Sequence, residues 1–471
     1  MSVKVRIAPS PTGNLHIGTA RTALFNWLFA RHHGGEFIMR VEDTDKERST
    51  KAFEKNITDG LKWLGINWDN SKIIRQSERL DIYRPYLQQL LDGGQAFWCH
   101  HTVEELVKEK DQQIKNKEPQ RHLCDHKNAE LARQPGQVIR LNIPWDSERK
   151  VKFDDLIRGT IEYDERLLGD MSIAKNLDTP LYNFAVVVDD FEMKITHVIR
   201  GEDHISNTPK QILIYSALGL ASPQFGHLPL ILAADRSKLS KRHGAVSVEE
   251  YEKDYLPEAL INFMGFLGYT YSKELLTMEE MAQEFDITKV HKSGAIFDTK
   301  KLNWLNAQYV RKLDPVIFKR LAKVPRLPDA AIVLATERLE KLSDAKEFEY
   351  FWKKPAYDKE LLSWKDSAPH IVQQSLIRSR EILEQWDFEN TSALRSELDE
   401  SAGGRPAPDG SAHTSNRGLV YWPLRVALSG KKASPDPVDI ARALGKKEAL
   451  ARVDAAIKKL GGSKKKAEGS A

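Results

Sequence analysis

Two cysteines and two histidines in this sequence have the types and the spacing of a metal site. They form two Cys-x-His pairs separated by 22 residues: Cys99, His101, Cys124 and His126. Sulfur and imidazole ligands in two close pairs suit a tetrahedral structural zinc ion. The chain has only these 2 cysteines, so chance rarely places them this way. His100 and His122 are competing ligands, and a lost site with residual ligands is the alternative.

Two further segments have the composition of a nucleotide site. Residues 8–19 (APSPTGNLHIGT) leave a strand-like segment and open a helix, where backbone amides and the helix dipole can receive phosphates. Far downstream, residues 238–242 (KLSKR) place three cations on one loop, and mobile ammonium groups suit a triphosphate. An ordinary Pro/Gly turn and an exposed basic loop are the alternatives.

The elements that position these segments follow an α/β pattern. Residues 3–7 alternate as in a half-buried strand, helical spacing runs over 20–28, and residues 37–41 are strand-like. Strand, tight turn, helix and strand form a parallel unit, so a Rossmann-like, doubly wound sheet is expected. Strand-like segments at 184–188 and 195–199 resume the pattern after a looser, charged stretch. The sheet domain is therefore predicted to be split by an insertion.

Changes of pattern also divide the chain into parts. Beyond residue 251 the spacing is helical, and the last residues are rich in Lys and Gly. We expect a catalytic domain over 1–72 and 179–250, an insertion with the metal-site candidates over 73–178, helical domains over 251–312 and 313–460, and a disordered tail over 461–471.

Composition restricts the class of protein. The chain has 471 residues, a formal net charge of +4 and 2 cysteines. It is too long for one hydrophobic core, too weakly basic for a histone-like binder and too poor in cysteine for a disulfide-stapled secreted fold. It lacks an apolar run of about 18 residues and a signal-peptide core. These features predict a multidomain cytoplasmic protein without a membrane partner.

The two nucleotide segments together resemble the paired signatures of the class I aminoacyl-tRNA synthetases. Further segments resemble one subfamily, the bacterial glutamyl-tRNA synthetases. They are RVEDTD from Arg40, LYNFAVVVDD from Leu181, IRGEDH from Ile199 and KLNWLN from Lys301. This resemblance covers the chain from residue 3 to about 310, and WPLRVALSG from Trp422 extends it less closely.

The resemblance implies a glutamate–tRNA ligase. Such an enzyme activates glutamate with ATP to glutamyl-adenylate and transfers it to the 3′-terminal adenosine of tRNA(Glu), with tRNA(Gln) as an open second substrate. Catalytic roles fall on His16, Lys238 and Lys241. ATP, accompanied by magnesium, would be bound by Thr12, His16, Gly18, Ile231, Lys238, Ser240 and Lys241. Glutamate would be bound by Arg6, Ser10, Glu42, Tyr182 and Arg200.

Charge and position give these assignments a physical basis. A buried substrate with two carboxylates needs fixed cations, and arginine offers bidentate geometry. The ordinary alternatives are an outward-facing Arg6, a surface Glu42 and a core Tyr182. Some relatives carry asparagine where this chain has Val186, which changes the expected surroundings of the α-carboxylate.

The resemblance also assigns the remaining parts. It implies that the insertion binds the acceptor stem, that some members hold zinc there, that 251–312 contacts the stem and that 313–460 binds the anticodon. Arg338, in a segment that resembles a helix, is a candidate anticodon reader or a solvated helix arginine. We expect a monomer.

Four rival functions share part of this pattern. An adenylate-forming nucleotidyltransferase and the truncated relative that glutamylates queuosine in tRNA both lack a long helical C-terminal half. Glutaminyl-tRNA synthetase has a β-barrel there. A noncatalytic tRNA-binding scaffold would not need two intact nucleotide segments. Each of these features favours the ligase.

Overall fold

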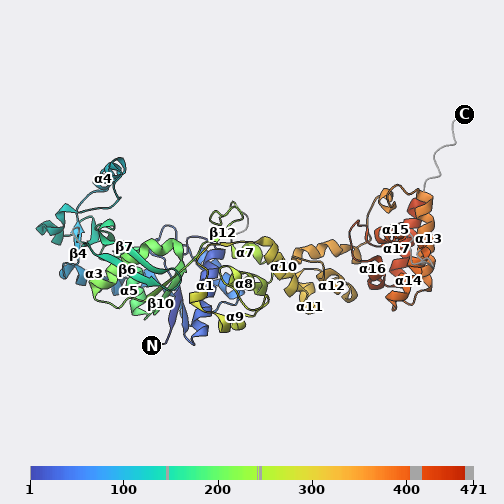
Figure 1. Ribbon diagram of the computed structural model, residues 1–471, viewed down its shortest axis with the longest axis horizontal. Helices are drawn as coiled ribbons and strands as arrows, with labels where there is room; N and C mark the ends of the chain where they lie inside the picture. The colour runs from blue at the N-terminus through green and yellow to red at the C-terminus, as the bar shows by residue number, and fades with distance from the viewer. Residues whose placement is uncertain (1, 145–147, 241, 243–246, 404–415, 462–471) are drawn as a thin grey trace. The chain divides into compact units, whose positions relative to one another are not determined.

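The computed structural model describes residues 2–144, 148–240, 242, 247–403 and 416–461. These residues divide into two compact units, Met1–Leu305 (the first unit) and Asn306–Ala471 (the second unit) (Figure 1). The candidate Lys241, and the predicted tail from residue 462 onward, lie outside the described residues.

Parallel strands form the centre of the first unit. One sheet contains β1 (Lys4–Ile7), β2 (Glu36–Val41) and β3 (Ile74–Arg75), and a neighbouring sheet contains β10 (His197–Gly201) and β11 (Gln224–Leu228). β1 pairs in parallel with β2, β2 with β3, and β10 with β11. The backbone N–H of Thr196 donates to the Lys4 carbonyl oxygen over 2.9 Å, so the start of β10 lies beside β1. The split, Rossmann-like sheet is confirmed.

Helix α1 (Ile17–His32) begins at the turn that follows β1. Most of its residues are buried, as expected for a helix that the sheet and other helices cover on several sides. The other helices of the first unit are α2 (Lys51–Trp63), α3 (Leu80–Asp92), α4 (Val103–Asn116), α5 (Tyr182–Glu192), α6 (Thr208–Leu218), α7 (Val248–Tyr251), α8 (Pro257–Phe266) and α9 (Met278–Glu284), and α10 (Thr299–Val310) contains the boundary between the units.

The strand expected at 184–188 is wrong, because these residues lie inside helix α5. The side chains of residues 184–188 are all apolar and buried. When a short apolar run is buried on every side, its sequence has no hydrophobic periodicity that would distinguish a strand from a helix. The strand expected at 195–199 is β10, shifted by two residues.

The predicted insertion contributes to two sheets. One is an antiparallel sheet of β4 (Ala96–Cys99), β5 (Val138–Leu141), β8 (Ser172–Asn176) and β9 (Thr179–Pro180). The other receives β6 (Lys150–Asp155), which pairs in parallel with β11, and β7 (Gly159–Asp164), which pairs antiparallel with β6. The strand β6, which lies within 73–178, therefore extends the sheet of the catalytic part.

Short elements complete the first unit. They are β12 (Ile231–Leu232), β13 (Ala295–Ile296) and the 3-10 helices η1 (Gln76–Glu78), η2 (Asp125–Asn128), η3 (Glu130–Arg133), η4 (Glu165–Leu167), η5 (Glu202–Asn207) and η7 (Ile287–Lys289). β12 pairs in parallel with β13.

The second unit is helical, and its described residues contain no strand. Its elements are α11 (Pro315–Leu321), α12 (Asp329–Thr336), η8 (Leu342–Phe351), η9 (Lys359–Leu362), α13 (Pro369–Gln385), α14 (Thr391–Ser401), α15 (Arg417–Ser429), α16 (Pro437–Leu444) and α17 (Lys446–Gly461). The predicted helical C-terminal half is confirmed. Arg338, however, lies in a turn between α12 and η8 and not in a helix.

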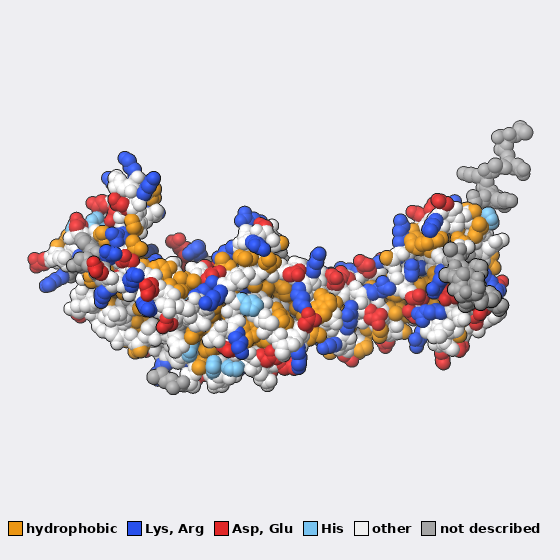
Figure 2. Space-filling view, in the orientation of Figure 1, with side chains coloured by type: hydrophobic (Ala, Val, Ile, Leu, Met, Phe, Trp, Pro, Cys, Tyr) orange, Lys and Arg blue, Asp and Glu red, His pale blue; other side chains and the backbone are white. Residues whose placement is uncertain are grey.

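The surface carries both signs of charge. On the face drawn in Figure 2, Lys and Arg side chains are interspersed with Asp and Glu side chains in each unit, in keeping with the small net charge of +4. Among the described residues, no helix has the length and apolar character needed to span a bilayer.

Candidate functional site

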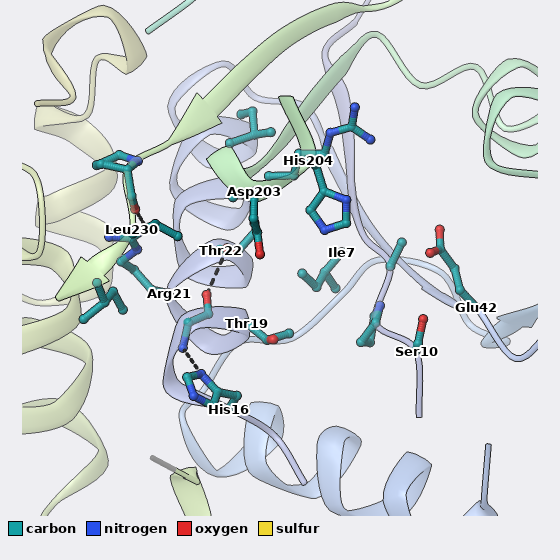
Figure 3. A pocket seen from close by; sticks show the side chains of 18 of the residues that line it. Ile7, Ser10, His16, Thr19, Arg21, Thr22, Glu42, Asp203, His204 and Leu230 are labelled. Carbon is teal, nitrogen blue, oxygen red and sulfur yellow. Dashed lines mark hydrogen bonds between the residues drawn. The ribbon is translucent and has the colours of Figure 1, made fainter. Parts of the chain in front are cut away.

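A cavity of about 430 Å³ opens at the carboxyl ends of β1, β2 and β10, beside the start of helix α1 (Figure 3). This is the position at which open parallel sheets bind ligands. Nine predicted site residues line it: Arg6, Ser10, His16, Gly18, Glu42, Tyr182, Arg200, Ile231 and Lys238. Two described candidates, Thr12 and Ser240, are not among its lining residues.

The N-terminus of α1 forms one wall of this cavity. His16 precedes the helix, and its Nδ1 accepts the backbone N–H of Gly18 over 3.0 Å (Figure 3). A Cβ atom at Gly18 would lie 3.3 Å from this Nδ1, which is closer than most such contacts. His16 therefore caps the helix, and Gly18 leaves room for the cap. The positive end of the helix dipole faces the cavity, which suits phosphate.

Lys238, the first cation of the basic segment, also lines the cavity. Lys238 Nζ forms an ion pair with Asp203 Oδ2 over 3.2 Å, and both side chains are about half exposed. Asp203 and His204 belong to η5, directly after β10, and lie on the cavity wall in Figure 3. The first lysine of the predicted signature is thus beside the candidate nucleotide site.

Arg6 and Glu42 are buried, which excludes the interpretation of both as surface charges. Arg6 donates to Asp190 through Nε over 3.1 Å and through Nη2 over 3.2 Å. Arg40, which is fully buried, donates to Asp190 over 2.6 Å and to Glu42 over 3.0 Å. Asp190 and Arg40 therefore hold Arg6 and Glu42, two of the residues predicted to bind glutamate, from behind the cavity wall.

Burial and the neighbouring arginines have opposite effects on the pKa values of Glu42 and Asp190. Burial raises the pKa of Glu42, and Arg40 partly opposes the shift. Burial also acts to raise the pKa of Asp190, but Arg6 and Arg40 lower it below the ordinary value. Asp189, the neighbouring carboxylate, accepts hydrogen bonds from Gln76, Arg79 and Tyr83. Buried charges of this density need such pairing.

Arg200 is also buried, and its Nη1 is a buried donor without a hydrogen-bond partner. Its Nη2 donates to Thr208 Oγ1 over 2.8 Å and its Nε to His227 Nε2 over 3.3 Å. Burial lowers the pKa of Arg200. A buried guanidinium with an unused donor at a cavity wall calls for an acceptor from a ligand.

Tyr182 lies on the same wall. Its hydroxyl is 3.3 Å from His204 Nδ1, and burial raises the pKa of Tyr182 to about 12. Burial lowers the pKa of His204 to about 4, and Arg200 adds to this shift. The two groups are therefore a neutral phenol and a neutral imidazole near pH 7, able to bind a ligand without adding charge.

Sequence reasoning missed the residues behind the cavity wall. Asp189 and Asp190 follow an apolar run in α5, and two carboxylates beside buried apolar residues imply buried cations as partners. That signal could have pointed to them. His227 and Asp155 carried no such signal, because their importance depends on strand pairing.

Cys99, His101 and Cys124 meet in the insertion, together with His122. Cys99 Sγ lies 3.5 Å from His101 Nδ1, 3.6 Å from His122 Nε2 and 3.9 Å from Cys124 Sγ, which is 3.6 Å from His101 Nδ1. A tetrahedral zinc with bonds of about 2.3 Å to sulfur and about 2.0 Å to nitrogen requires S–S and S–N separations of roughly 3.8 and 3.6 Å. The donor set fits zinc.

The predicted fourth ligand, His126, is placed differently from the other three. Its ring stacks on that of His101, with centroids 4.5 Å apart, and it forms a second possible donor group with His101, Cys124 and Asp125, without Cys99. His122 instead donates from Nδ1 to Glu109 over 2.6 Å. A carboxylate on the far nitrogen is the usual partner of a metal-bound histidine.

Arg338 lines a separate cavity of about 400 Å³ in the second unit. Phe348 and Tyr350 of η8 and Lys431, which follows α15, also line it. Three carboxylates, those of Glu340, Asp344 and Glu347, line it as well, and the rings of Phe348 and Tyr350 are buried.

Comparison with known proteins identifies both parts of the chain. Residues 2–304 match the family "tRNA synthetases class I (E and Q), catalytic domain", and residues 280–457 match "Anticodon binding domain". The glutamate–tRNA ligase of Desulforamulus reducens is 40% identical over 97% of this chain and 100% of its own length. Glutamate–tRNA ligase 1 of Coxiella burnetii is 42% identical over 97% of this chain and 98% of its own.

Solved structures agree. The crystal structure of a glutamate tRNA ligase from Elizabethkingia meningosepticum, in complex with its amino acid, has a TM-score of 0.84 at 32% identity and covers 97% of this chain and 99% of that chain. The glutamate–tRNA synthetase of Elizabethkingia anophelis has a TM-score of 0.82 at 32% identity. With a class I catalytic domain, an anticodon-binding domain and full-length relatives of this identity, the chain belongs to the glutamate–tRNA ligase family.

Proposed function

We propose that this protein activates glutamate with ATP and transfers it to the 3′-terminal adenosine of tRNA(Glu). The observation that carries the proposal is the charge pattern of the cavity wall. Arg6 and Arg200 offer two cations to two carboxylates, and Glu42 offers one anion to one ammonium group. Glutamate has this set of charges, and its neutral relatives lack one of them.

Each residue that is proposed to bind the substrate glutamate has a distinct role. Asp190 holds two nitrogens of Arg6, which leaves Nη1 for the substrate. The unpartnered Nη1 of Arg200 supplies the second cation, and Tyr182 and Ser10 supply neutral hydrogen bonds. Glu42 receives the substrate ammonium group, and Arg40 partly opposes the burial that raises the pKa of this carboxyl group.

The reaction needs no protein nucleophile. The glutamate α-carboxylate attacks the α-phosphate of ATP and pyrophosphate leaves, after which a ribose hydroxyl of the tRNA attacks the activated carbonyl and AMP leaves. His16, Gly18 and the α1 terminus would hold the phosphates, with Lys238 and Lys241 stabilising the charge on the leaving pyrophosphate. Magnesium would accompany ATP and offset phosphate charge. Thr12, Ile231 and Ser240 remain proposed ATP contacts.

Aminoacylation of separate transcripts tests this function. Labelled glutamate should be transferred to tRNA(Glu) in the presence of ATP, and the same assay with tRNA(Gln) decides the second substrate. Glutamine should not compete, because it lacks the second carboxylate. No charging of either transcript would contradict the proposal.

We further propose that the insertion holds a structural zinc ion through Cys99, His101, Cys124 and His122. Four of the six separations between the donor atoms have tetrahedral values, all six are within 4.8 Å, and Glu109 supports His122. His126, the fourth ligand expected from the sequence, lies outside the group that contains both cysteines. A bound zinc would cross-link the segments that follow β4 and precede η2.

Purified protein should therefore contain about one zinc per chain by elemental analysis. His122→Ala and Cys124→Ser should lose it, because each removes a ligand, whereas His126→Ala should keep it. Loss of zinc in His126→Ala, with retention in His122→Ala, would restore the ligand set expected from the sequence. Metal-free protein from a zinc-replete preparation would remove the site.

Arg338 is proposed to contact the anticodon from its cavity in the second unit. Its planar fork suits a base edge, and Lys431 adds a second cation to the cavity. Arg338→Ala should change the selectivity between anticodon variants by roughly tenfold, the effect of losing one base contact of about 1–3 kcal/mol.

The control is Arg320→Ala, an exposed arginine of α11 outside this cavity, which should leave selectivity unchanged. The measurement is the ratio of kcat/KM for tRNA(Glu) transcripts with native and altered anticodons. Equal losses on all transcripts in Arg338→Ala would mean that the residue is not an anticodon reader.

A further inference from the structure

Three neighbouring strands bring a carboxylate and an imidazole behind Arg200. In the sheet order β10–β11–β6, Arg200 of β10 is the register partner of His227 of β11, and β6 ends at Asp155 on the other side of β11. All three side chains are buried. They form a line that runs from the predicted insertion to the cavity wall.

The hydrogen bonds along this line determine the tautomer of His227. Its Nδ1 lies 2.5 Å from Asp155 Oδ2, and a carboxylate can only accept, so Nδ1 carries the proton. Its Nε2 lies 3.3 Å from Arg200 Nε, which can only donate, so Nε2 must be unprotonated. Thr208 Oγ1 accepts from Arg200 Nη2 over 2.8 Å and lies 3.0 Å from the same Nε2.

We propose that Asp155 and His227 are positioning residues that orient Arg200 toward the substrate carboxylate. This inference rests on the proposed binding of glutamate by Arg200. Two of the three guanidinium nitrogens, Nε and Nη2, are held from behind, so that Nη1 is the one left for the cavity. A fixed fork loses less conformational entropy on binding than a free one.

Asp155 also has a structural task. Its Oδ1 accepts the backbone N–H groups of Ile157 and Arg158, over 3.0 and 2.8 Å, which closes the turn after β6, and the backbone N–H of His227 over 3.2 Å, which ties this turn to β11. Its Oδ2 is left to His227. Asp155→Asn separates the two tasks, because an amide can keep the Oδ1 bonds while its nitrogen donates to His227 Nδ1. The imidazole would then carry its proton on Nε2, facing the N–H of Arg200.

The test compares KM for glutamate with kcat and with KM for ATP, in aminoacylation of tRNA(Glu) by the full chain. Asp155→Asn and His227→Leu should each raise KM for glutamate roughly ten- to a hundredfold, the value of one hydrogen bond to a charged group. KM for ATP should stay within about twofold, since the phosphates contact other residues. His227→Gln, which can present an acceptor near the position of Nε2, should recover part of the loss.

A matched control lies on the same strand. Asp154 is exposed and bonds Thr160, so Asp154→Asn should leave all constants unchanged. In the double variants, adding His227→Leu to Arg200→Lys should cost little more than Arg200→Lys alone, because both changes remove one interaction.

Several outcomes would contradict the proposed positioning role of Asp155 and His227. Asp155 and His227 would be merely structural if the effects of His227→Leu and Arg200→Lys multiply in the double variant. The same conclusion would follow if folded His227→Leu and Asp155→Asn keep the wild-type KM for glutamate, or if Asp155→Asn, His227→Leu and His227→Gln all fail to fold. Failure of the proposed function has a different appearance: the wild type would not charge tRNA(Glu), or Arg200→Lys itself would leave KM for glutamate unchanged.

Discussion

Arg200→Ala should raise the glutamate requirement by two or more orders of magnitude, while the affinity for ATP stays near that of the wild type. The variant leaves one substrate carboxylate buried without its cation, at a cost of about 3–5 kcal/mol. Packing cannot recover this loss, because the lost guanidinium leaves a cavity beside Thr208 and His227. KM values for glutamate and ATP, measured separately, check the result.

Arg200→Lys should rescue this loss only in part. One ammonium group cannot bond Thr208, His227 and a substrate carboxylate in the geometry of a planar fork. The informative comparison is with Arg79→Ala, which removes a cation that bonds Asp189 behind the wall and does not line the cavity. If Arg200→Ala keeps the wild-type affinity for glutamate, recognition of both carboxylates must be reassigned to Arg6.

Arg40→Met should destabilise the first unit by about 3–5 kcal/mol at neutral pH, because it leaves the buried Glu42 without its ion pair and Asp190 with Arg6 alone. Arg40 bonds Asp190 and Glu42 and lies 3.7 Å from Asp189. Peptide-resolved hydrogen exchange measures the loss, with peptides of the second unit as the internal reference. Arg31→Met, which breaks the half-exposed pair with Asp69, should cost less than about 1 kcal/mol.

The deficit of Arg40→Met should shrink as the pH falls. Burial already raises the pKa of Glu42, and Arg40 is the main group that opposes the rise, so its removal raises this pKa further. A carboxyl group with a higher pKa in the folded state binds more protons when folded, which favours folding in acid. The difference from the wild type should therefore decrease between about pH 8 and about pH 5. A deficit that is constant over this range would mean that lost packing, and not unpaired charge, is responsible.

The sequence predicts the parallel unit well because its signals are local. β1, the turn at His16 and α1 show alternation, Pro and Gly punctuation and helical spacing within one window each. The segment 184–188 failed because α5 is apolar on the faces that pack against its neighbours, so hydrophobicity there carries no period. The helical placement of Arg338 was wrong for a related reason, since a short charged stretch does not separate a helix from the turn that follows it.

Most of the residues that line the candidate site could also be predicted from the sequence, because they fall in segments with a family resemblance. The buried residues that hold these side chains in place could not be predicted. Asp190 meets Arg6 across 184 residues and His227 meets Asp155 across 72, and such pairs depend on which strands become neighbours. The choice between His122 and His126 likewise depends on the loop conformation, because both lie within two residues of Cys124.

The placement of β6 bears on how parts of such chains could be exchanged. An insertion that contributes no strand to the sheet of the catalytic part could be removed and replaced without disturbing that sheet. Here, removal of 73–178 would take away the strand that pairs with β11 and expose the carbonyl oxygen of Phe225 and the N–H group of His227, which bond Leu156 and Asp155. An open edge of this kind favours pairing between copies and aggregation. Grafts that keep residues 150–164, and exchange only the antiparallel sheet and α4, should therefore stay soluble where whole-segment swaps do not.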